Sequence, residues 1–499
     1  RPERALPAAV SGMCFLLQML IIILFAVFVR YSPNGSPGLC SARLNCSSRR
    51  NPGPGSSHLR SWNVHLQTLM GFGFLMVFLG RYRMESAATC LLVTAFAIQW
   101  ALLIQGFFYS FQNGKIYMET QSMVSAVFCA GAVLVSTGAL LGWGNPLQLL
   151  LMSLLEVPLF SANEYVLLHL IGVSDGGGSL TVHTFGAYFG LALSWILRQD
   201  HAGKREQQQD TGHSPDVLAA ADPCDLSPSC LSSLLSGTVC LWIFWPGFVS
   251  AAMVPASVEP WTELNTYVAM AASTLATFVM SPLLHKDGTP CMCQVQDATV
   301  AGAVVMGTAG EMLLAPFGAL VAGFLAGLIP PLSSRFFPPV SPLIRTHTGD
   351  SCNRGHSVQT LPGCPPCGCV PSKHVPSSVC RLQLAFPHIA DGSRTATYQA
   401  LCQLCALPVT LLFAVLGGSV TGAILKIKGL GSPLATSCLE NKTLQEVKWW
   451  FYQQNTQLSA QAAPPDGASW LDKGWVGKTA SLKPPRSCWD RSLCPPQQW

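Results

Sequence analysis

The sequence is short of charge. Asp, Glu, Lys and Arg make up only 11% of its 499 residues, whereas a soluble globular chain carries about 25%. A soluble fold of this length needs a polar coat, and these residues are too few to supply one. Because 49% of the residues are hydrophobic, the balance excludes an ordinary soluble protein and indicates a membrane protein.

Motifs typical of enzymes and of nucleic-acid binding are lacking too. The sequence contains no Walker loop, no HExxH and no recognisable pairing of a nucleophile with a base. It also has no basic stripe interleaved with aromatic residues, the pattern expected of a nucleic-acid surface. We therefore expect a protein that is not an enzyme, holds no cofactor or metal, and has no nucleic-acid partner.

Long apolar runs are the main feature that is present. A run of about 18 or more apolar residues can cross a bilayer core of about 30 Å as a helix. Cysteines within these runs, such as Cys14, Cys90, Cys129 and Cys240, are expected to pack as small apolar side chains. The runs predict an all-α, multi-pass helix bundle of eleven spans, near residues 11–29, 63–80, 87–109, 122–142, 147–172, 179–198, 229–254, 262–284, 298–315, 317–334 and 400–425.

Composition divides the chain into seven parts. Residues 11–29 also fit a cleaved signal peptide, but the run exceeds the ~7–15 residues of a typical signal core, which favours an anchor. The sequon at Asn45 predicts N-glycosylation if its loop is extracellular. We expect a cytosolic N-terminus (1–10), a first transmembrane helix (11–29), an extracellular glycosylated loop (30–61), a transmembrane domain (62–345), an aberrant segment rich in Pro and Cys (346–395), a last transmembrane helix (396–428) and a disordered cytosolic tail (429–499).

The stretch "SDGGGSLTVHTFGAYFGLALSWIL", residues 174–197, places titratable groups in a predicted span. A charge at mid-bilayer costs about 2.5–3.5 kcal/mol on insertion scales, so such residues face a bundle interior or a cavity. His183 shares a helix face with Gly186 and Gly190, a GxxxG pair that lets another helix approach closely. Two plainer interpretations stay open: His183 as a hydrogen-bonded imidazole linking helices, and Asp175 as a helix cap.

The same residues resemble a known family. "DGGGSLTVHTFGAYFG" is similar to the signature of the Rh glycoproteins, within the ammonium transporter/Rh superfamily, and is nearest to their B-type, non-erythroid branch. The resemblance covers roughly 1–30, 62–345 and 381–428. Further matching stretches occur in the family's order: "GFGFLMVFLGRY" (71–82), "AFAIQWALLIQGFF" (95–108), "LWIFWPGF" (241–248), "LNTYVAMAAST" (264–274) and "GTAGEMLLAPFGAL" (307–320).

The resemblance implies a fold, a function and a set of site residues. The fold would be a bundle of eleven helices, twelve in the family, in two inverted halves, with 62–345 as the pore domain. It would form a homotrimer in the plasma membrane, in contact with lipid, and pass ammonia, with carbon dioxide as a second candidate gas. The residues that match the family's pore positions are His183, Asp175, the gating pair Phe128 and Phe248, and Glu164.

The chain departs from the family pattern in one segment. The family's second pore histidine should lie within "DSCNRGHSVQTLPG", residues 350–363, yet its expected positions hold Val358 or Gln359, and His356 is out of register. A frameshifted or mis-spliced stretch is the simplest explanation for 346–395. The same tract could instead hold a metal through a CxxC. The alternative function is a non-conducting structural subunit, joined to a hetero-oligomer or to the cytoskeleton, or a decayed homologue.

Overall fold

The computed structural model describes residues 5–31, 84–140, 144–208, 228–251, 259–284, 288–309, 314–336, 389, 392 and 394–426. All of these belong to one compact unit, Arg1–Leu434, and the second unit is Ala435–Trp499. Several predictions therefore lie outside the described residues. They are the span 63–80, the loop that holds Asn45, the segment 346–388 and the tail 429–499.

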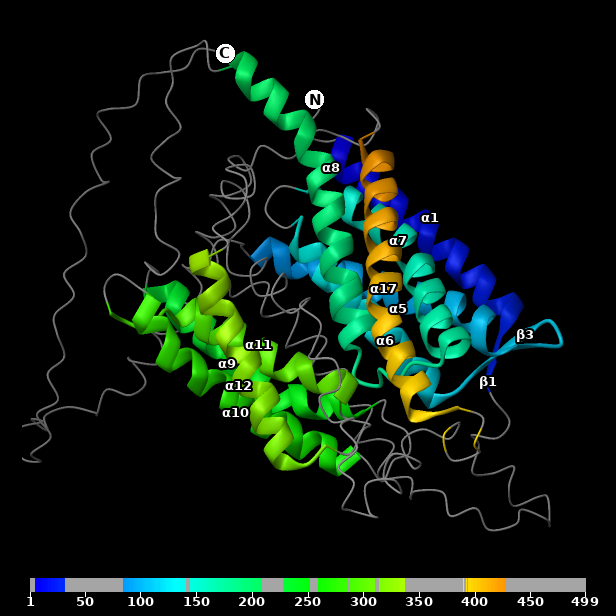
Figure 1. Cartoon of the computed structure of the whole chain (residues 1–499). Helices are drawn as coiled ribbons and strands as arrows, with labels where there is room; N and C mark the ends of the chain where they lie inside the picture. The colour runs from blue at the N-terminus through cyan, green and yellow to red at the C-terminus, as the bar shows by residue number, and fades with distance from the viewer. Residues whose placement is uncertain are drawn as a thin grey trace, which may run out of the picture. The chain divides into compact units, whose positions relative to one another are not determined.

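The described chain is helical, which confirms the predicted fold class, and Figure 1 shows its arrangement. Among the described residues seven helices are long and apolar enough to cross a membrane, and each predicted span that falls there overlaps a helix. The helices are α1 (Ala5–Phe28), α5 (Met84–Tyr109), α6 (Thr120–Gly138), α7 (Pro146–Tyr165), α8 (Phe185–Gln208), α9 (Pro228–Ser250), α10 (Glu259–Leu284), α11 (Met292–Ala309), α12 (Pro316–Phe336) and α17 (Ala396–Leu425).

Two π-helical segments flank the loop that the sequence singled out. The segment η4 (Val166–Ile171) continues α7, and η5 (Ser179–Thr184) leads into α8. The predicted spans 147–172 and 179–198 each join such a segment to its α-helix. Single-turn π-helical insertions of this kind are often found at functional sites.

A small sheet adds to the predicted all-α fold. It consists of β1 (Val29–Tyr31), β2 (Phe111–Gln112) and β3 (Lys115–Met118) in the order β1-β3-β2. The pair β2-β3 is antiparallel, and its turn uses Asn113 and Gly114, both with positive φ. The strand β1 pairs parallel with β3, and the Lys115 ammonium donates to the Val27 carbonyl at 2.6 Å. The end of α1 is thereby joined to the β2-β3 hairpin.

One predicted span was misplaced along the chain. The prediction was 298–315, but α11 runs from Met292 to Ala309. The first turns of α11 carry Gln296 and Asp297, which are polar and yet buried within the bundle. A hydropathy argument assigns polar residues to loops, so it could not place the start of this helix.

Small residues let helices pack at close range. A Cβ at Gly186 would lie 2.7 Å from the Ala132 carbonyl oxygen of α6, and one at Gly190 would lie 3.0 Å from Ser136 Cα. This confirms that the GxxxG pair is a helix contact, and α6 is the partner. Gly323 and Gly327 on α12 make the equivalent backbone contact with α10, the type of packing that membrane helices favour.

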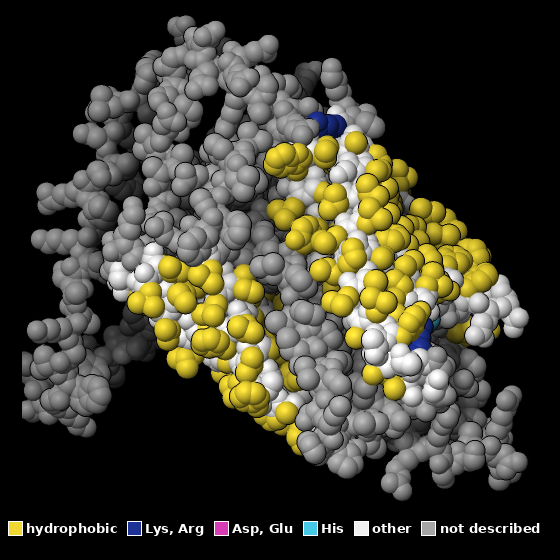
Figure 2. Space-filling model, viewed as in Figure 1, with side chains coloured by type: hydrophobic (Ala, Val, Ile, Leu, Met, Phe, Trp, Pro, Cys, Tyr) yellow, Lys and Arg dark blue, Asp and Glu magenta, His cyan; other side chains and the backbone are white. Residues whose placement is uncertain are grey.

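Apolar side chains cover the outer faces of the helices (Figure 2). Leu416 on α17, Leu275 on α10 and Phe317 on α12 are more than half exposed. In a soluble protein a continuous apolar surface would lead to association. Here the apolar surface is the one expected to contact lipid. The described part of the chain therefore has the features of a multi-pass membrane protein.

Candidate functional site

The Asp175 carboxylate organises the start of η5. Its Oδ2 atom accepts hydrogen bonds from the backbone N–H groups of Leu180 and Thr181, at 3.0 and 2.8 Å, and from the Thr181 hydroxyl at 2.9 Å. Gly172 and Gly178 on either side have φ near +70°, a region that glycine enters without strain. Asp175 therefore caps a helix, as the plainer interpretation held, and this cap orients the segment that carries His183.

The His183 side chain is fully buried in η5. Its ring is stacked on the indole of Trp245 from α9, with centroids 5.2 Å apart and an angle of 19°. The ring of Phe248 meets His183 edge-on at 6.5 Å. His183 thus lies within an aromatic cluster formed by α9 and η5.

The two predicted gating rings are in direct contact. Phe128 on α6 and Phe248 on α9 are stacked, with centroids 4.5 Å apart and planes at 11°. Both rings are buried. The structure therefore brings together three of the predicted residues, Phe128, Phe248 and His183, from parts of the chain up to 120 positions apart.

The loop between η4 and η5 is held from two sides. On one side, the Gly177 N–H donates to the Gly307 carbonyl at 2.9 Å, and Ser179 Oγ lies 2.5 Å from the Val304 carbonyl oxygen of α11. On the other side, three side chains at the start of α17 donate to loop carbonyls: Arg394 to Ile171 at 2.8 Å, Gln399 to Gly172 at 2.8 Å and Gln403 to Ser174 at 3.0 Å.

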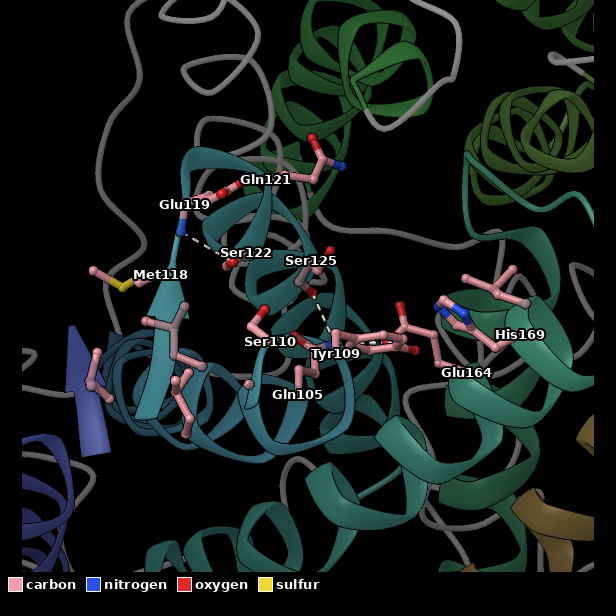
Figure 3. Close-up of a pocket in the computed structure, with 15 residues that line it drawn as sticks. Gln105, Tyr109, Ser110, Met118, Glu119, Gln121, Ser122, Ser125, Glu164 and His169 are labelled. Carbon is pink, nitrogen blue, oxygen red and sulfur yellow. Dashed lines mark hydrogen bonds between the residues drawn. The ribbon is translucent and has the colours of Figure 1, made fainter. Parts of the chain in front are cut away.

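Glu164 lies apart from the aromatic cluster and lines a cavity of about 320 Å³ (Figure 3). Its Oε2 atom accepts hydrogen bonds from Gln105 Nε2 at 2.9 Å and from the Tyr109 hydroxyl at 3.2 Å. The Tyr109 ring lies 4.9 Å from the His169 ring, so aromatic faces adjoin the carboxylate. The fifteen described lining residues include Glu119 as a second acid and contain no Lys or Arg.

Two parts of this site were not predicted from the sequence. Trp245 is the ring on which His183 stacks, and it precedes Phe248 by three residues, so both point from one face of α9. That spacing within "LWIFWPGF" was the signal that could have identified it. The contact of Gln105 with Glu164 joins residues 59 positions apart, and no local pattern predicts it.

No cluster of three or more His, Cys, Asp or Glu side chains suited to a metal occurs in the described part of the chain. The residues of the alternative metal site all lie in the segment 346–388, outside that part. The four span cysteines named from the sequence are free thiols, as predicted.

Comparison with known proteins decides the family. The Ammonium Transporter Family profile matches residues 57–430. This chain belongs to that family. Ammonium transporter Rh type B of Papio hamadryas is 44% identical over 444 residues, covering 87% of this chain and 92% of the relative. The Xenopus tropicalis protein of the same name is 41% identical over 441 residues, with the same coverage.

Solved structures agree with the family at the level of fold. Rh50 of Nitrosomonas europaea, from the Rhesus protein family of channels, is 26% identical and gives a TM-score of 0.59, covering 82% of this chain and 98% of that chain. Mep2 of Candida albicans is 16% identical, with a TM-score of 0.57 and coverage of 76% and 86%. At that identity the second likeness concerns the fold alone.

Proposed function

We propose that this protein is a channel-like ammonium transporter that passes neutral ammonia through each subunit. The observation that carries the proposal is the aromatic cluster, in which the stacked pair Phe128 and Phe248 continues directly to the buried His183. Family membership supports the substrate. The cluster supports the path, because its apolar walls can pass a neutral molecule but desolvate an ion at a prohibitive cost.

The stacked rings would act where the substrate leaves water. A ring face attracts a cation with about 0.5–2 kcal/mol, so Phe128 and Phe248 favour arrival of ammonium while their contact restricts passage. Both are buried and their planes are nearly parallel. Passage past them therefore requires one ring to rotate, which makes the pair a gate.

His183 would be the polar step behind the gate. A neutral imidazole has one donor and one acceptor nitrogen, so it can exchange hydrogen bonds with ammonia without gaining charge. Asp175 contributes by capping η5 and so fixing the orientation of His183.

Glu164 would attract ammonium before the gate. Its carboxylate lines the 320 Å³ cavity beside the rings of Tyr109 and His169, with no Lys or Arg among the described lining residues. A carboxylate and aromatic faces together form a site for a small cation. We propose that this cavity concentrates ammonium, and that ammonium gives its proton to solvent water before ammonia passes the rings.

The family assignment also supports a proposal on assembly and location. We propose a homotrimer with one pore per subunit in the plasma membrane, surrounded by lipid, with Asn45 glycosylated and carbon dioxide as a second gas. In such a trimer, part of the exposed apolar surface of α10 and α12 would contact a neighbouring subunit, and the rest would contact lipid. Cross-linking of the intact protein in membranes tests the stoichiometry.

The alternative, a non-conducting structural subunit bound to a partner or to the cytoskeleton, is not favoured. Relatives named as ammonium transporters share 44% identity over 87% of this chain. The residues assigned to gate and pore are those that the described structure clusters. A cytoskeletal anchor would need no such buried aromatic path.

The test is gas flux in reconstituted vesicles. Purified protein in liposomes with an internal pH dye should accelerate alkalinisation in an ammonium gradient relative to protein-free liposomes. His183→Leu should lower the protein-dependent rate about tenfold or more, a loss of at least ~1.4 kcal/mol in the barrier. Phe189→Leu, a fully buried ring change on α8 outside the cluster, is the matched control. Equal rates for wild type and His183→Leu would remove the assigned pore.

A further inference from the structure

Glu156 is an ionisable residue in the interior that the proposed pore does not use. It lies in α7, within the apolar stretch 146–171, and its side chain is fully buried. An acid at such a position is costly unless its environment compensates for the burial. Among the described residues no Lys, Arg or His is hydrogen-bonded to its carboxyl group.

The polar contact of Glu156 within the described residues is Ser136 on α6. Ser136 Oγ is within hydrogen-bond distance of Glu156 Oε1, of the Gly186 carbonyl at 2.8 Å and of the Ala132 carbonyl at 3.2 Å. A serine hydroxyl has a single hydrogen. It can therefore donate to only one of these three acceptors, and the contacts cannot all be hydrogen bonds donated by Ser136.

A proton on the carboxyl group resolves this shortage of donors. The Glu156 acid O–H donates to Ser136 Oγ, and the Ser136 hydrogen then goes to the Gly186 carbonyl. If Glu156 were ionised, it would take that hydrogen itself and leave the Gly186 contact without one. Its other oxygen, Oε2, has no hydrogen-bond partner in the described structure, which costs a neutral carbonyl oxygen far less than a charged one.

The contact between Glu156 and Ser136 lies close in the fold to the segment that carries His183. Gly186 lies one helical turn after His183, and Gly186 and Gly190 press directly on α6 at Ala132 and Ser136. The Glu156–Ser136 link therefore lies where α6, α7 and α8 meet. It joins α7 to the tight contact between α6, which carries Phe128, and α8, which continues directly from the segment of His183.

We propose that Glu156 is held as a neutral carboxylic acid and that, through Ser136 and the Gly186 carbonyl, it is a positioning residue for His183. The neutral acid fixes the register of α8 on α6 without bringing a charge near the pore. The flux part of this inference rests on the proposed function, but the protonation part does not.

Two substitutions at Glu156 separate a neutral acid from a charge. Glu156→Gln keeps the shape and offers an amide N–H to Ser136, so reconstituted protein should retain wild-type flux within about twofold and the same pH profile. Glu156→Leu removes the donor and should lower flux about tenfold, the value of one buried hydrogen bond. Equal losses in the two variants would overturn the inference, because a neutral amide would then fail to replace the group.

Infrared spectroscopy gives a readout that does not depend on transport. The purified full-length protein at neutral pH should show a carboxylic-acid C=O band that Glu156→Gln lacks. Identical spectra in that region would show an ionised Glu156 and overturn the proposal. If wild-type protein carried no flux at all, the proposed function would fail while this spectrum still decided the protonation state. The spectrum also decides the protonation state of Glu156 in the case that Glu156→Leu does not fold, because it compares only wild type with Glu156→Gln.

The route through Ser136 has its own matched pair. Ser136→Ala should lower flux about as much as Glu156→Leu, and the double variant should cost no more than either single change. Ser161→Ala is the control, since Ser161 is equally buried on α7 but, within the described residues, donates only to Val157 of its own helix. Equal flux in Ser136→Ala and Ser161→Ala would overturn the assignment of a positioning role.

Discussion

The Ser179 hydroxyl lies 2.5 Å from the carbonyl oxygen of Val304, across 125 positions of sequence. The same hydroxyl accepts a hydrogen bond from the Thr308 N–H at 3.0 Å. One side chain at the start of η5 thus satisfies two backbone groups of α11. It connects the segment of His183, in the first half of the chain, to the second half.

Removal of this hydroxyl should destabilise the protein. Ser179→Ala leaves the Thr308 N–H without its acceptor, and a buried unsatisfied donor costs about 1–3 kcal/mol. We expect a lower thermal unfolding midpoint for the detergent-solubilised protein. Ser194→Ala is the control, because the one hydrogen bond of Ser194 to another described residue goes to Leu191 of its own helix. A midpoint no lower than that of Ser194→Ala would contradict the linking role.

Asp175 should be needed more for its oxygen than for its charge. Asp175→Ala removes the acceptor of three hydrogen bonds and should cost about 1–2 kcal/mol, as for other helix caps. Asp175→Asn retains one carbonyl oxygen that can accept from Leu180 and Thr181, so its stability should be closer to wild type. Thermal midpoints rank the three proteins. If the two variants were equally destabilised, the carboxylate would act through its charge.

The glutamines of α17 should stabilise the loop before Asp175. Gln403→Leu removes the donor to the Ser174 carbonyl, and Gln399→Leu removes the donor to Gly172. Each should cost about 1 kcal/mol, and hydrogen exchange of residues 172–178 should accelerate in both. Thr410→Val, on the same helix, removes a buried hydroxyl that has no partner among the described residues. Thr410→Val should leave stability unchanged or raise it. If hydrogen exchange of residues 172–178 were as fast in Thr410→Val as in Gln403→Leu, the hydrogen bonds from the glutamines would not be what stabilises the loop.

Gly186 should tolerate no larger residue. Gly186→Ala places a Cβ 2.7 Å from the Ala132 carbonyl oxygen, so α6 and α8 must separate. We expect a loss of stability of about 1–3 kcal/mol, the range for overpacking, and reduced flux. Gly12→Ala is the control, since nothing lies within 4 Å of a Cβ there. Similar unfolding midpoints for the two variants would exclude a close helix contact at Gly186.

Local patterns were sufficient to predict some of this molecule. Apolar runs placed the helices because burial in lipid requires length and low polarity, and the spacing of Gly186 and Gly190 predicted a close helix contact. His183, Phe128 and Phe248 were identified through resemblance, and the structure brings them together. Their roles in transport stay predictions, to be tested by flux.

Long-range pairing was what the sequence could not provide. The strand Val29–Tyr31 has only three residues, too few for any periodicity, and its partner lies far along the chain. The acceptor role of Glu164 depends on Gln105 and Tyr109 from another helix. The start of α11 could not be predicted because its polar residues are buried against neighbouring helices, whereas hydropathy assigns polar residues to exposed loops.

The pairing of β1 with β3 has a consequence for biosynthesis. Strand β1 ends the first helix, yet its partner, Lys115–Met118, is translated only after α5 is complete. A ribosome therefore completes α1 before the strand that pairs with its C-terminal end exists. The strand pairing that joins the end of α1 to the hairpin can therefore form only once residues 115–118 have been translated.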